Sequence, residues 1–423
     1  MIQLQNKKDC CGCESCVQRC PKHCIVMQED EEGFSYPQIN IELCINCGLC
    51  EKVCPVINQN DPRDPIGVYA AKNPNDEIRL QSSSGGIFTM LAEQIIDDGG
   101  VVFGVGYNKH WEAAHSYTET KEGLAAFRMS KYVQSIVGNT FKEAENFLKK
   151  GRKVLYSGTP CQIAGLKKYL RREYDNLLTV DFICHGTPSP GVFRWYLGEE
   201  IAKAAKKKDI KYRYNLTSIP KADDLAKEYG LEIKNIRFRD KTNGWKNFYF
   251  VLELSDSSII KKKNSVLLSD THNNVKDCLF KIFESKYENV YLKGFLRDLY
   301  LRPSCYSCPT KKFKSGSDIT IADFWAINHF LPDENDHKGY SLLMIHSNKI
   351  DIEKLHAINI DDEQVYKSNV TIYKSPIETQ TRESFFIECN KFPSKNLIYL
   401  INKYATVSFV KRIKLFIASL LKN

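Results

Sequence analysis

The chain has 423 residues, of which 43% are hydrophobic and 26% charged, and its formal net charge is +9. This length predicts two or three domains, and the composition is typical of folded globular proteins rather than disordered or collagen-like ones. No apolar run reaches the roughly 18 residues that a membrane span needs. The N-terminal residues hold cysteines and charges instead of a secretory signal, so we expect a cytoplasmic protein.

Residues 1–60 contain ten of the sixteen cysteines, and a polar segment with two prolines separates them from the rest of the chain. A disulfide scaffold needs a secreted chain, and nothing in this sequence directs secretion. We therefore expect the cysteines of this N-terminal module to bind metal in a reducing cytosol.

The N-terminal module carries the motif C-x2-C-x2-C-x3-C-P twice, starting at Cys10 and at Cys44. Three cysteines two residues apart can surround a cubane, and the fourth reaches the other cluster, which predicts two [4Fe-4S] clusters. Zinc sites usually use two separated Cys-x2-Cys pairs, and two full copies with both prolines argue against zinc. We expect neither Cys11 nor Cys24 to be a ligand. The expected ligands are Cys10, Cys13, Cys16 and Cys54 for one cluster and Cys20, Cys44, Cys47 and Cys50 for the other.

After the linker, segments with the pattern of strands and helices alternate. We expect strands at 68–71, 101–107, 154–156 and 177–184, and helices at 85–98, 139–150, 163–172 and 191–205. Such alternation indicates an α/β domain with a partly parallel sheet. From residue 231 the pattern changes to paired strands at 233–239 and 248–254 around a turn at 242–244, with one more strand at 319–322.

Four further cysteines have a recognisable context. Cys161 and Cys184 follow predicted strands, and Cys305 and Cys308 form a Cys-x2-Cys pair. Four thiolates suffice for one more [4Fe-4S] cluster, and this is our hypothesis. In the alternative, Cys305 and Cys308 form a small zinc or redox pair while the other two thiols are merely buried.

Two helix starts are candidate ligand sites. Ser84 is a good N-cap for the predicted helix 85–98, and free backbone N–H groups at a positive helix end suit a diphosphate. The neighbouring glycines, Gly85 and Gly86, let the backbone approach a ligand closely. Thr159 and Pro160 follow a buried strand and precede a helix, where α/β domains place ligands. The alternative for the first site is a plain capped helix.

Six segments then occur in a specific order along the chain. They are 81–86 (QSSSGG), 130–135 (SKYVQS), 157–162 (SGTPCQ), 181–186 (DFICHG), 302–308 (RPSCYSC) and 318–325 (DITIADFW). With the N-terminal module, this order resembles the beta-subunit family of the coenzyme F-420 (deazaflavin) hydrogenases and dehydrogenases, over about residues 1 to 330. One departure is Ala322, which stands where a glycine is usual before the aspartate.

The resemblance implies FAD and iron–sulfur clusters as cofactors. It also implies electron transfer between a deazaflavin, or another organic two-electron compound, and one-electron carriers. Bacterial members often occur beside capsular or exopolysaccharide genes, which implies a sugar intermediate of surface polysaccharide biosynthesis as another substrate. The implied fold is α/β (α+β). Its parts are a two-cluster ferredoxin-type domain at 1–60, the two parts of a mixed α/β flavin-binding domain at 66–150 and 151–340, and a C-terminal extension with a helical tail at 341–423.

The resemblance also assigns roles to individual residues. Lys131 is expected near the flavin ring or a phosphate, where it would stabilise negative charge, the alternative being a surface lysine. His185 is expected to donate a proton or hold a substrate carbonyl, although a structural histidine fits as well. The expected FAD-binding residues are Ser83, Ser84, Gly85, Gly86, Lys131, Tyr132, Gln134, Ser135, Thr159, Pro160, Gln162, Asp323 and Trp325. Trp325 fits a core position equally.

The C-terminal residues 409–422 form a basic amphipathic pattern, with Phe409, Ile413 and Phe416 on one helical face and Lys411 and Lys414 on the other. A helix of this kind can lie on the inner face of an anionic membrane, or pack on its own domain or on a partner. We therefore expect a cytoplasmic protein. One role expected for this tail is peripheral contact with the membrane.

The sequence as a whole predicts a flavin- and iron–sulfur-dependent oxidoreductase that works with an electron-carrier protein or a partner enzyme. The alternative is an electron-transfer subunit without an organic substrate of its own. A nucleic-acid-binding iron–sulfur protein is suggested only by the positive charge, which is concentrated in the tail without interleaved aromatic stacking platforms. We therefore expect no nucleic-acid partner.

Overall fold

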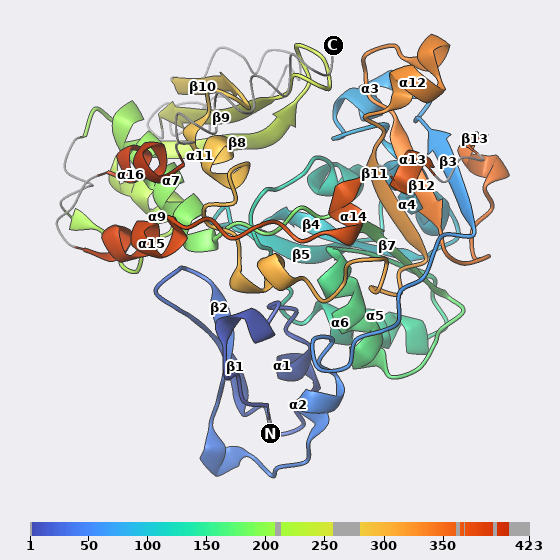
Figure 1. Ribbon diagram of the computed structural model, residues 1–423, viewed down its shortest axis with the longest axis horizontal. Coiled ribbons are helices and arrows are strands. Elements are labelled where there is room, and N and C mark those ends of the chain that lie inside the picture. The colour runs from blue at the N-terminus through green and yellow to red at the C-terminus, as the bar shows by residue number, and fades with distance from the viewer. Residues whose placement is uncertain are drawn as a thin grey trace, which may run out of the picture.

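The computed structural model describes residues 2–207, 213–256, 280–360, 364–367, 369–391 and 396–405. The expected amphipathic helix at 409–422 lies outside these residues. A small N-terminal module packs against one side of a larger body that contains two separate sheets (Figure 1). Within the part of the chain that is described, no helix has both the length and the apolar character needed to cross a membrane.

The N-terminal module is built from a hairpin and short helical turns. Strands β1 (Ile25–Glu29) and β2 (Ser35–Ile39) pair antiparallel, and α1 (Ser15–Arg19) and α2 (Leu49–Lys52) each begin within a cysteine loop and carry the third cysteine of its motif, Cys16 or Cys50. Two 3-10 turns, η1 (Lys7–Asp9) and η2 (Ile41–Leu43), precede those loops. The residue before each α-helix, Glu14 or Gly48, has a positive φ. This left-handed conformation reverses the direction of the chain at the end of the cysteine loop.

The large sheet has the strand order β13-β3-β12-β11-β7-β6-β4-β5. Strands β4, β6, β7 and β11 run parallel to their neighbours within that group, and the flanking strands are antiparallel, so the expected mixed α/β sheet is present. The expected ranges 66–150, 151–340 and 341–423 all contribute strands to it. The strands are β3 (Gly67–Ala71), β4 (Val101–Tyr107), β5 (Ala113–Thr118), β6 (Val154–Ser157), β7 (Leu177–Phe182), β11 (Ile319–Asp323), β12 (Ser341–Ile345) and β13 (Ile358–Asn359).

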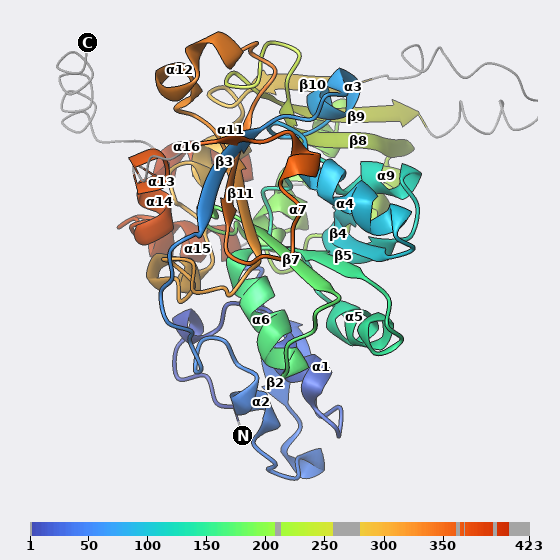
Figure 2. The same ribbon diagram turned by 90° about the vertical axis from the view of Figure 1, so that its right-hand side faces the viewer.

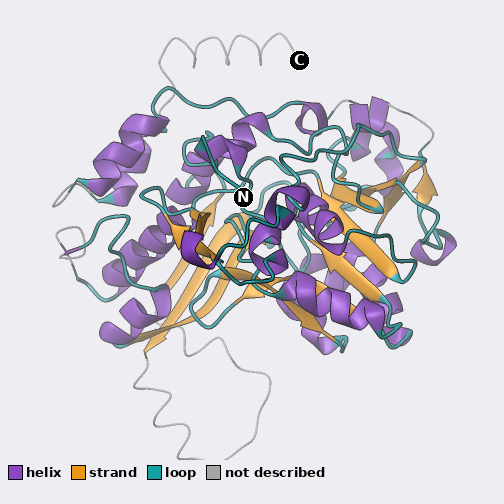
Figure 3. Cartoon of the chain, turned by 90° about the horizontal axis from the view of Figure 1, so that it is seen from below, coloured by secondary structure: helices purple, strands orange, loops and turns teal. Residues whose placement is uncertain are grey.

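Both faces of the large sheet are covered by helices, because alternate residues of its central strands are apolar. Val101 and Phe103 of β4 pack with α5 (Thr140–Lys149) and α6 (Pro160–Leu170), whereas Val102 faces α4 (Ile87–Asp97) on the other side. Seen from below, the strands run through the centre of the body with helices around them (Figure 3).

A second, three-stranded antiparallel sheet has the order β10-β9-β8. The expected strand pair is confirmed as β8 (Leu231–Asp240) and β9 (Tyr249–Asp256), and β10 (Phe280–Ser285) extends it. This sheet shares one apolar core with α7 (Pro190–Ala204), α9 (Ala222–Glu228), α11 (Val290–Phe295), α15 (Arg382–Asn390) and α16 (Leu397–Tyr404). The remaining elements are α3 (Asp76–Leu80), η3 (Glu122–Phe127), η4 (Pro303–Ser307), α12 (Ile327–Phe330), η5 (Pro332–Glu334), η6 (Glu353–Leu355), α13 (Gln364–Lys367) and α14 (Val370–Tyr373).

Specific polar contacts join the N-terminal module to the body. The Glu14 carboxylate accepts hydrogen bonds of 2.9 Å from the backbone N–H groups of Val137 and Gly138, and Gln18 accepts one of 3.0 Å from Phe141 at the start of α5. Helix α6 extends from the large sheet toward α1 and α2 (Figure 2). These contacts fix the first cysteine loop against the end of the sheet where the Thr159–Cys161 segment lies.

Candidate metal centres and cofactor site

The eight expected ferredoxin ligands surround two pockets. In each pocket, three cysteines of one motif meet the fourth cysteine of the other, as in two-cluster ferredoxins. Burial raises the pKa of Cys54 to about 11, so the positive charge of a metal is needed to hold it as a thiolate. Cys10, Cys13, Cys16 and Cys54 line the inner pocket, and Cys20, Cys44, Cys47 and Cys50 line the outer pocket.

The two pockets differ in their exposure to solvent. Cys47 of the outer pocket is exposed, and Ile41, Leu43 and Ile45 beside it are 70%, 55% and 58% exposed. The inner pocket lies against the large body, since Cys13 packs on Gly165 of α6. Electrons that leave or enter the module from solution therefore have their shortest approach at the outer pocket. Cys24 also lines that pocket, with its Sγ 3.4 Å from the Sγ of Cys20.

The four remaining candidate ligands come together at the carboxyl ends of β6 and β7. Cys161 lies in the first turn of α6, Cys184 follows β7, and Cys305 and Cys308 lie in and directly after η4. Burial, together with the nearby thiols of Cys305, Cys161 and Cys308, raises the pKa of Cys184 well above its usual value. A set of four mutually close thiols fits the donor chemistry of a [4Fe-4S] cluster.

Three threonine hydroxyls contact sulfurs of this four-cysteine site. Thr159 Oγ1 lies 3.2 Å from Cys161 Sγ, Thr187 Oγ1 lies 3.5 Å from Cys305 Sγ, and Thr310 Oγ1 lies 3.3 Å from Cys308 Sγ. Each threonine lies within three residues of a candidate ligand in the sequence. Hydrogen bonds of this kind stabilise negative charge on sulfur, which favours the thiolate form that a cluster requires.

Cys11, expected to have no role, links the inner pocket to the four-cysteine site. Its thiol interacts with the thiols of both Cys13 and Cys161, and these interactions, together with burial, raise the pKa of Cys11 well above its usual value. The hydrogen bond from Cys11 lowers the pKa of Cys161 to about 7, with burial acting in the opposite direction. One thiol therefore bridges two sets of candidate ligands. Its position outside the C-x2-C register gave no sign of this.

Arg239 organises the expected flavin-binding segments, although the sequence did not single it out. It is buried, pairs with Asp323 at 2.8 Å, and donates hydrogen bonds to the Tyr132 hydroxyl at 3.2 Å and the Ser83 carbonyl at 3.1 Å. Strict alternation along β8 would point residue 239 away from this site after the buried Phe238. A register shift between Arg237 and Asp240 turns it inward instead.

The start of α4 differs from the expected capped helix. Ser84 is not the N-cap, because its hydroxyl donates to the Tyr340 carbonyl at 2.6 Å; the N-cap is Gly86, at φ 80°, and no side chain caps the helix. A side chain at Gly85 would meet the Ala71 carbonyl at 2.6 Å. The uncapped α4 and the buried Arg239 Nε, which has no hydrogen-bond partner in the described structure, both suit an anionic ligand. These residues therefore fit a cofactor diphosphate.

Other expected cofactor residues are engaged inside the protein. Gln162 Oε1 accepts from the Thr159 backbone N–H at 2.9 Å and completes a capping box at the start of α6, where Pro160 occupies the first turn. Its Nε2 donates to Ser135 Oγ at 2.9 Å, and Ser135 contacts His115. Their side chains therefore set the position of Cys161, two residues after the N-cap.

The two expected catalytic residues have defined partners. Lys131 Nζ donates hydrogen bonds of 2.9 Å to the carbonyls of Ala126 and Arg128, and burial lowers the pKa of Lys131 to about 7. His185 Nε2 lies 2.5 Å from Asp298 Oδ1. The His185 ring contacts Phe295, which stacks on Tyr132 at 4.9 Å. Two aromatic rings therefore separate His185 from Arg239, the hydrogen-bond partner of Tyr132.

Trp325 and Gln134 have different surroundings. Trp325 is 45% exposed and stacks at 4.7 Å on the buried Trp245, so it is a surface residue rather than a core residue. Gln134 Nε2 donates to the Cys11 carbonyl at 3.3 Å, and its Oε1 accepts from Arg302 at 3.0 Å. Gln134 thus contacts the ferredoxin-type module directly.

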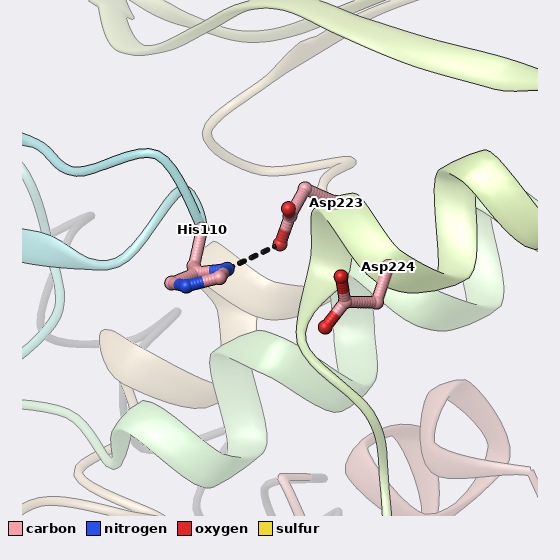
Figure 4. Close-up of side chains that lie close together, drawn as sticks. All are labelled: His110, Asp223 and Asp224. Atoms are coloured by element: carbon pink, nitrogen blue, oxygen red, sulfur yellow. Dashed lines mark hydrogen bonds and ion pairs between the residues drawn. The ribbon is translucent and has the colours of Figure 1, made fainter.

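His110, Asp223 and Asp224 form a separate group of potential ligands (Figure 4). His110 Nδ1 lies 2.8 Å from Asp223 Oδ1, and Lys227 Nζ lies 2.7 Å from the other oxygen of the same carboxylate. Because Lys227 already supplies positive charge to both aspartates, we interpret the group as an ion-pair network that joins the β4–β5 turn to α9.

Comparisons with known proteins find relatives of two parts of the chain. Residues 9–58 match the family model described as 4Fe-4S dicluster domain, and residues 151–358 match the one described as the C terminus of the Coenzyme F420 hydrogenase/dehydrogenase beta subunit. The F subunit of the F(420)H(2) dehydrogenase of Methanosarcina mazei is 21% identical over 162 residues, or 36% of this chain. The chain spans 46% of that protein's length.

Two further relatives match other parts of the chain. Ketoisovalerate oxidoreductase subunit VorC of Methanothermobacter marburgensis is 36% identical over 55 residues, which are 12% of this chain and 70% of VorC. A solved structure of the F420-reducing [NiFe] hydrogenase complex from Methanosarcina barkeri is similar over 82% of this chain and 92% of that chain, with 14% identity and a TM-score of 0.39. The resemblance stated from the sequence motifs is confirmed by the two family models. The chain carries a 4Fe-4S dicluster domain at its N-terminus and, over residues 151–358, the C-terminal domain of the coenzyme F420 hydrogenase/dehydrogenase beta-subunit family.

Proposed function

We propose that this protein is an FAD- and iron–sulfur-dependent oxidoreductase that exchanges electrons between an organic two-electron substrate and a one-electron partner. The contact of Cys11 with both Cys13 and Cys161 carries this proposal. It joins the dicluster domain to the four-cysteine site by neighbouring sulfurs. A ferredoxin-type domain that was only tethered to the body would not need such a contact.

We assign the four-cysteine site to a third [4Fe-4S] cluster, held by Cys161, Cys184, Cys305 and Cys308. Burial, and to a lesser extent the thiols of the other three, raise the pKa of Cys184, so a thiolate there is unfavourable without a metal. Thr187 and Thr310 would donate hydrogen bonds to the ligand sulfurs, whereas the Thr159 hydroxyl donates to Gln162 Oε1 at 2.9 Å. A cluster at this position carries one electron at a time and brings no organic chemistry of its own.

We assign the FAD site to the region organised by Arg239. FAD, when bound, exchanges a hydride with an organic compound and single electrons with clusters, and the protein supplies binding and orientation. The backbone N–H groups at the start of α4 would bind the diphosphate, with Gly85 and Gly86 allowing close approach. Arg239 holds the Ser83 carbonyl, Tyr132 and Asp323 in one arrangement. Lys131, through its ammonium group, would favour negative charge near the ring.

The organic substrate proposed first is a deazaflavin, because that coenzyme stands in the names of the matched family and of the similar dehydrogenase. The second is a sugar intermediate of surface polysaccharide biosynthesis. His185 and Lys131 are the proposed catalytic residues, since each offers an N–H group near the Tyr132 ring or its segment. The one-electron partner would be a carrier protein or a partner enzyme that approaches the exposed Cys47.

Anaerobic purification followed by acid extraction tests the cofactor set. We expect released FAD, and about twelve iron atoms per chain with as much labile sulfide. In Cys305→Ala the count should fall to about eight, because the dicluster domain keeps its own ligands. Turnover with reduced deazaflavin and a one-electron dye then separates the enzyme from the alternative. An electron-transfer subunit without an organic substrate would hold iron but show neither extractable FAD nor turnover.

A further inference from the structure

Arg302 is a buried cation of the large body that reaches into the dicluster domain. It is 1% exposed and donates hydrogen bonds to the Cys10 carbonyl at 2.7 Å, to Gln134 Oε1 at 3.0 Å and to the Ser35 carbonyl at 3.0 Å. A further contact joins its Nη2 to Cys10 Sγ at 3.5 Å. The guanidinium also lies over the Tyr36 ring at 4.2 Å and near Phe34 at 5.5 Å. Its position is therefore fixed from several sides.

The charge of Arg302 is not neutralised by a direct ion pair. Within the described residues, no carboxylate lies within ion-pair distance of it, and the Glu14 carboxylate acts on it only from further away. Its direct partners are neutral oxygens and one sulfur. Guanidinium groups stay protonated in proteins, so a permanent positive charge contacts Cys10 Sγ at the edge of the inner pocket, whose lining also includes Asp9 and Glu14.

The outer pocket has a different set of donors. Cys20 is approached by the backbone N–H groups of Cys24, Lys22 and His23, and no buried guanidinium contacts its sulfurs in the described structure. Cys47 there is exposed to solvent, which screens charge. The two halves of a duplicated motif thus have unequal electrostatic surroundings, and the inequality comes from a residue outside the domain.

We propose that Arg302 raises the reduction potential of the cluster held by Cys10, Cys13, Cys16 and Cys54. Reduction adds one electron and no proton to this cluster, so its net negative charge grows by one. A buried cation that donates an N–H group to a ligand sulfur stabilises the reduced form more than the oxidised form. The electron comes from dithionite in the test below, and from the organic two-electron donor in the protein's reaction.

This inference deepens the proposed function and rests on it. In that function the inner cluster is the one of the two ferredoxin-type clusters that lies nearest the body. Arg302 directly precedes Pro303 and lies in the same turn as Cys305, whose backbone N–H donates to the Arg302 carbonyl at 2.8 Å. The segment that supplies two ligands to the four-cysteine site would therefore also set the potential of the neighbouring cluster. A ferredoxin domain docked without Arg302 would lose that setting.

The test is a dithionite titration of the full-length protein, followed by electron paramagnetic resonance of the reduced clusters. In Arg302→Met, we expect one dicluster couple to move to more negative potential while the other stays. Arg302→Lys should keep most of the wild-type value, because it retains the charge. Arg194→Met is the matched control. It removes another buried arginine at the same interface, which pairs with Glu29 and touches no sulfur, and it should move neither couple.

Unchanged couples in Arg302→Met with full iron content would overturn the proposal, as would an equal shift in the Lys and Met variants. If the Met variant loses iron, wild-type protein labelled with ¹⁵N-arginine decides. A ¹⁵N coupling to a reduced cluster in pulsed double resonance supports the contact, and its absence rejects the proposal. Failure to find FAD or a third cluster would instead count against the proposed function and leave these dicluster readings valid.

Discussion

The Cys11 thiol of the dicluster domain interacts with the Cys161 thiol at the start of α6, although 150 positions separate the two residues. The same thiol contacts Cys13, so candidate ligands of two sites are joined through one side chain that binds neither cluster in our assignment. The relationship explains why the N-terminal domain is docked by specific hydrogen bonds rather than left on a tether.

The first prediction concerns Cys11 itself. Cys11→Ala should keep the wild-type iron and sulfide content, because Cys11 is not an assigned ligand, and should slow reduction of the dicluster domain by the organic donor severalfold. Stopped-flow absorbance of the clusters measures that rate. Cys389→Ala removes a buried thiol in the core of the second sheet and should leave the rate unchanged. Loss of one cluster's iron in Cys11→Ala would show instead that Cys11 is a ligand.

A second prediction concerns the packing of the dicluster domain on α6. A Cβ at Gly165 would lie 2.7 Å from Ser15 Oγ and 2.8 Å from Cys13 Cβ. Gly165→Ala should therefore push the domain away and lower the free energy of unfolding by about 1–3 kcal/mol, as overpacking generally does. Anaerobic urea unfolding measures this. Lys168→Ala on the same helix is the control, and equal stability of the two variants would contradict the described contact.

The third prediction concerns the buried pair of Arg239 and Asp323. Arg239→Met leaves the Asp323 carboxylate without its partner, which should cost about 3–5 kcal/mol and abolish FAD retention. The neighbouring Arg237 pairs with Asp240 and Glu253 in a more exposed position, so Arg237→Met should cost less than about 1 kcal/mol and retain FAD. Retention of FAD at the wild-type level in Arg239→Met would remove Arg239 from the cofactor site.

The fourth prediction is a pH dependence of stability. Burial lowers the pKa of His115 to about 4, and the ordinary value is 6.5. The unfolded chain therefore binds the proton first as the pH falls, so the stabilisation is complete above about pH 6.5 and declines toward pH 4. Between pH 7.5 and 5.5 the free energy of unfolding should fall by about 1 kcal/mol from this group.

Chemical denaturation at the two pH values measures this change, with His115→Gln as the comparison. Neutral His115 donates to the Ser157 carbonyl at 3.2 Å and accepts from Ser135, which supports Gln162 and the start of α6. The Gln variant should be less stable at pH 7.5 and should lack this part of the pH dependence. The same pH dependence in both proteins would show that a group other than His115 binds the proton.

The sequence predicted the parts of the fold and site that depend on local spacing. The two cysteine motifs, the strand at 101–107 and the helix at 139–150 all follow patterns within a few residues. Strand β12 was missed because its five buried residues, Ser341–Ile345, form a short apolar run in a region expected to be an extension. Strand β5 was missed because this edge strand has few apolar residues.

The missed functional residues depend on contacts between distant parts of the chain. Arg302 is the first residue of the recognised segment 302–308, but its partners Cys10 and Ser35 are more than 260 positions away. Arg239 turns inward only because of a bulge in β8. Ser84 has the residue type of an N-cap, yet its hydroxyl bonds to Tyr340, on a segment that only the sheet topology brings near. No local pattern encodes these neighbours.

The most direct test of the account reduces anaerobic protein with reduced deazaflavin and follows the dicluster domain by electron paramagnetic resonance. In the wild type, signals of reduced dicluster should appear within turnover time. In Cys305→Ala, which keeps the ligands of the dicluster domain but disrupts the four-cysteine site, dithionite should still produce those signals and deazaflavin should not. Reduction of the dicluster by deazaflavin at the wild-type rate in Cys305→Ala would contradict the proposal that the four-cysteine site connects the organic substrate to the ferredoxin clusters.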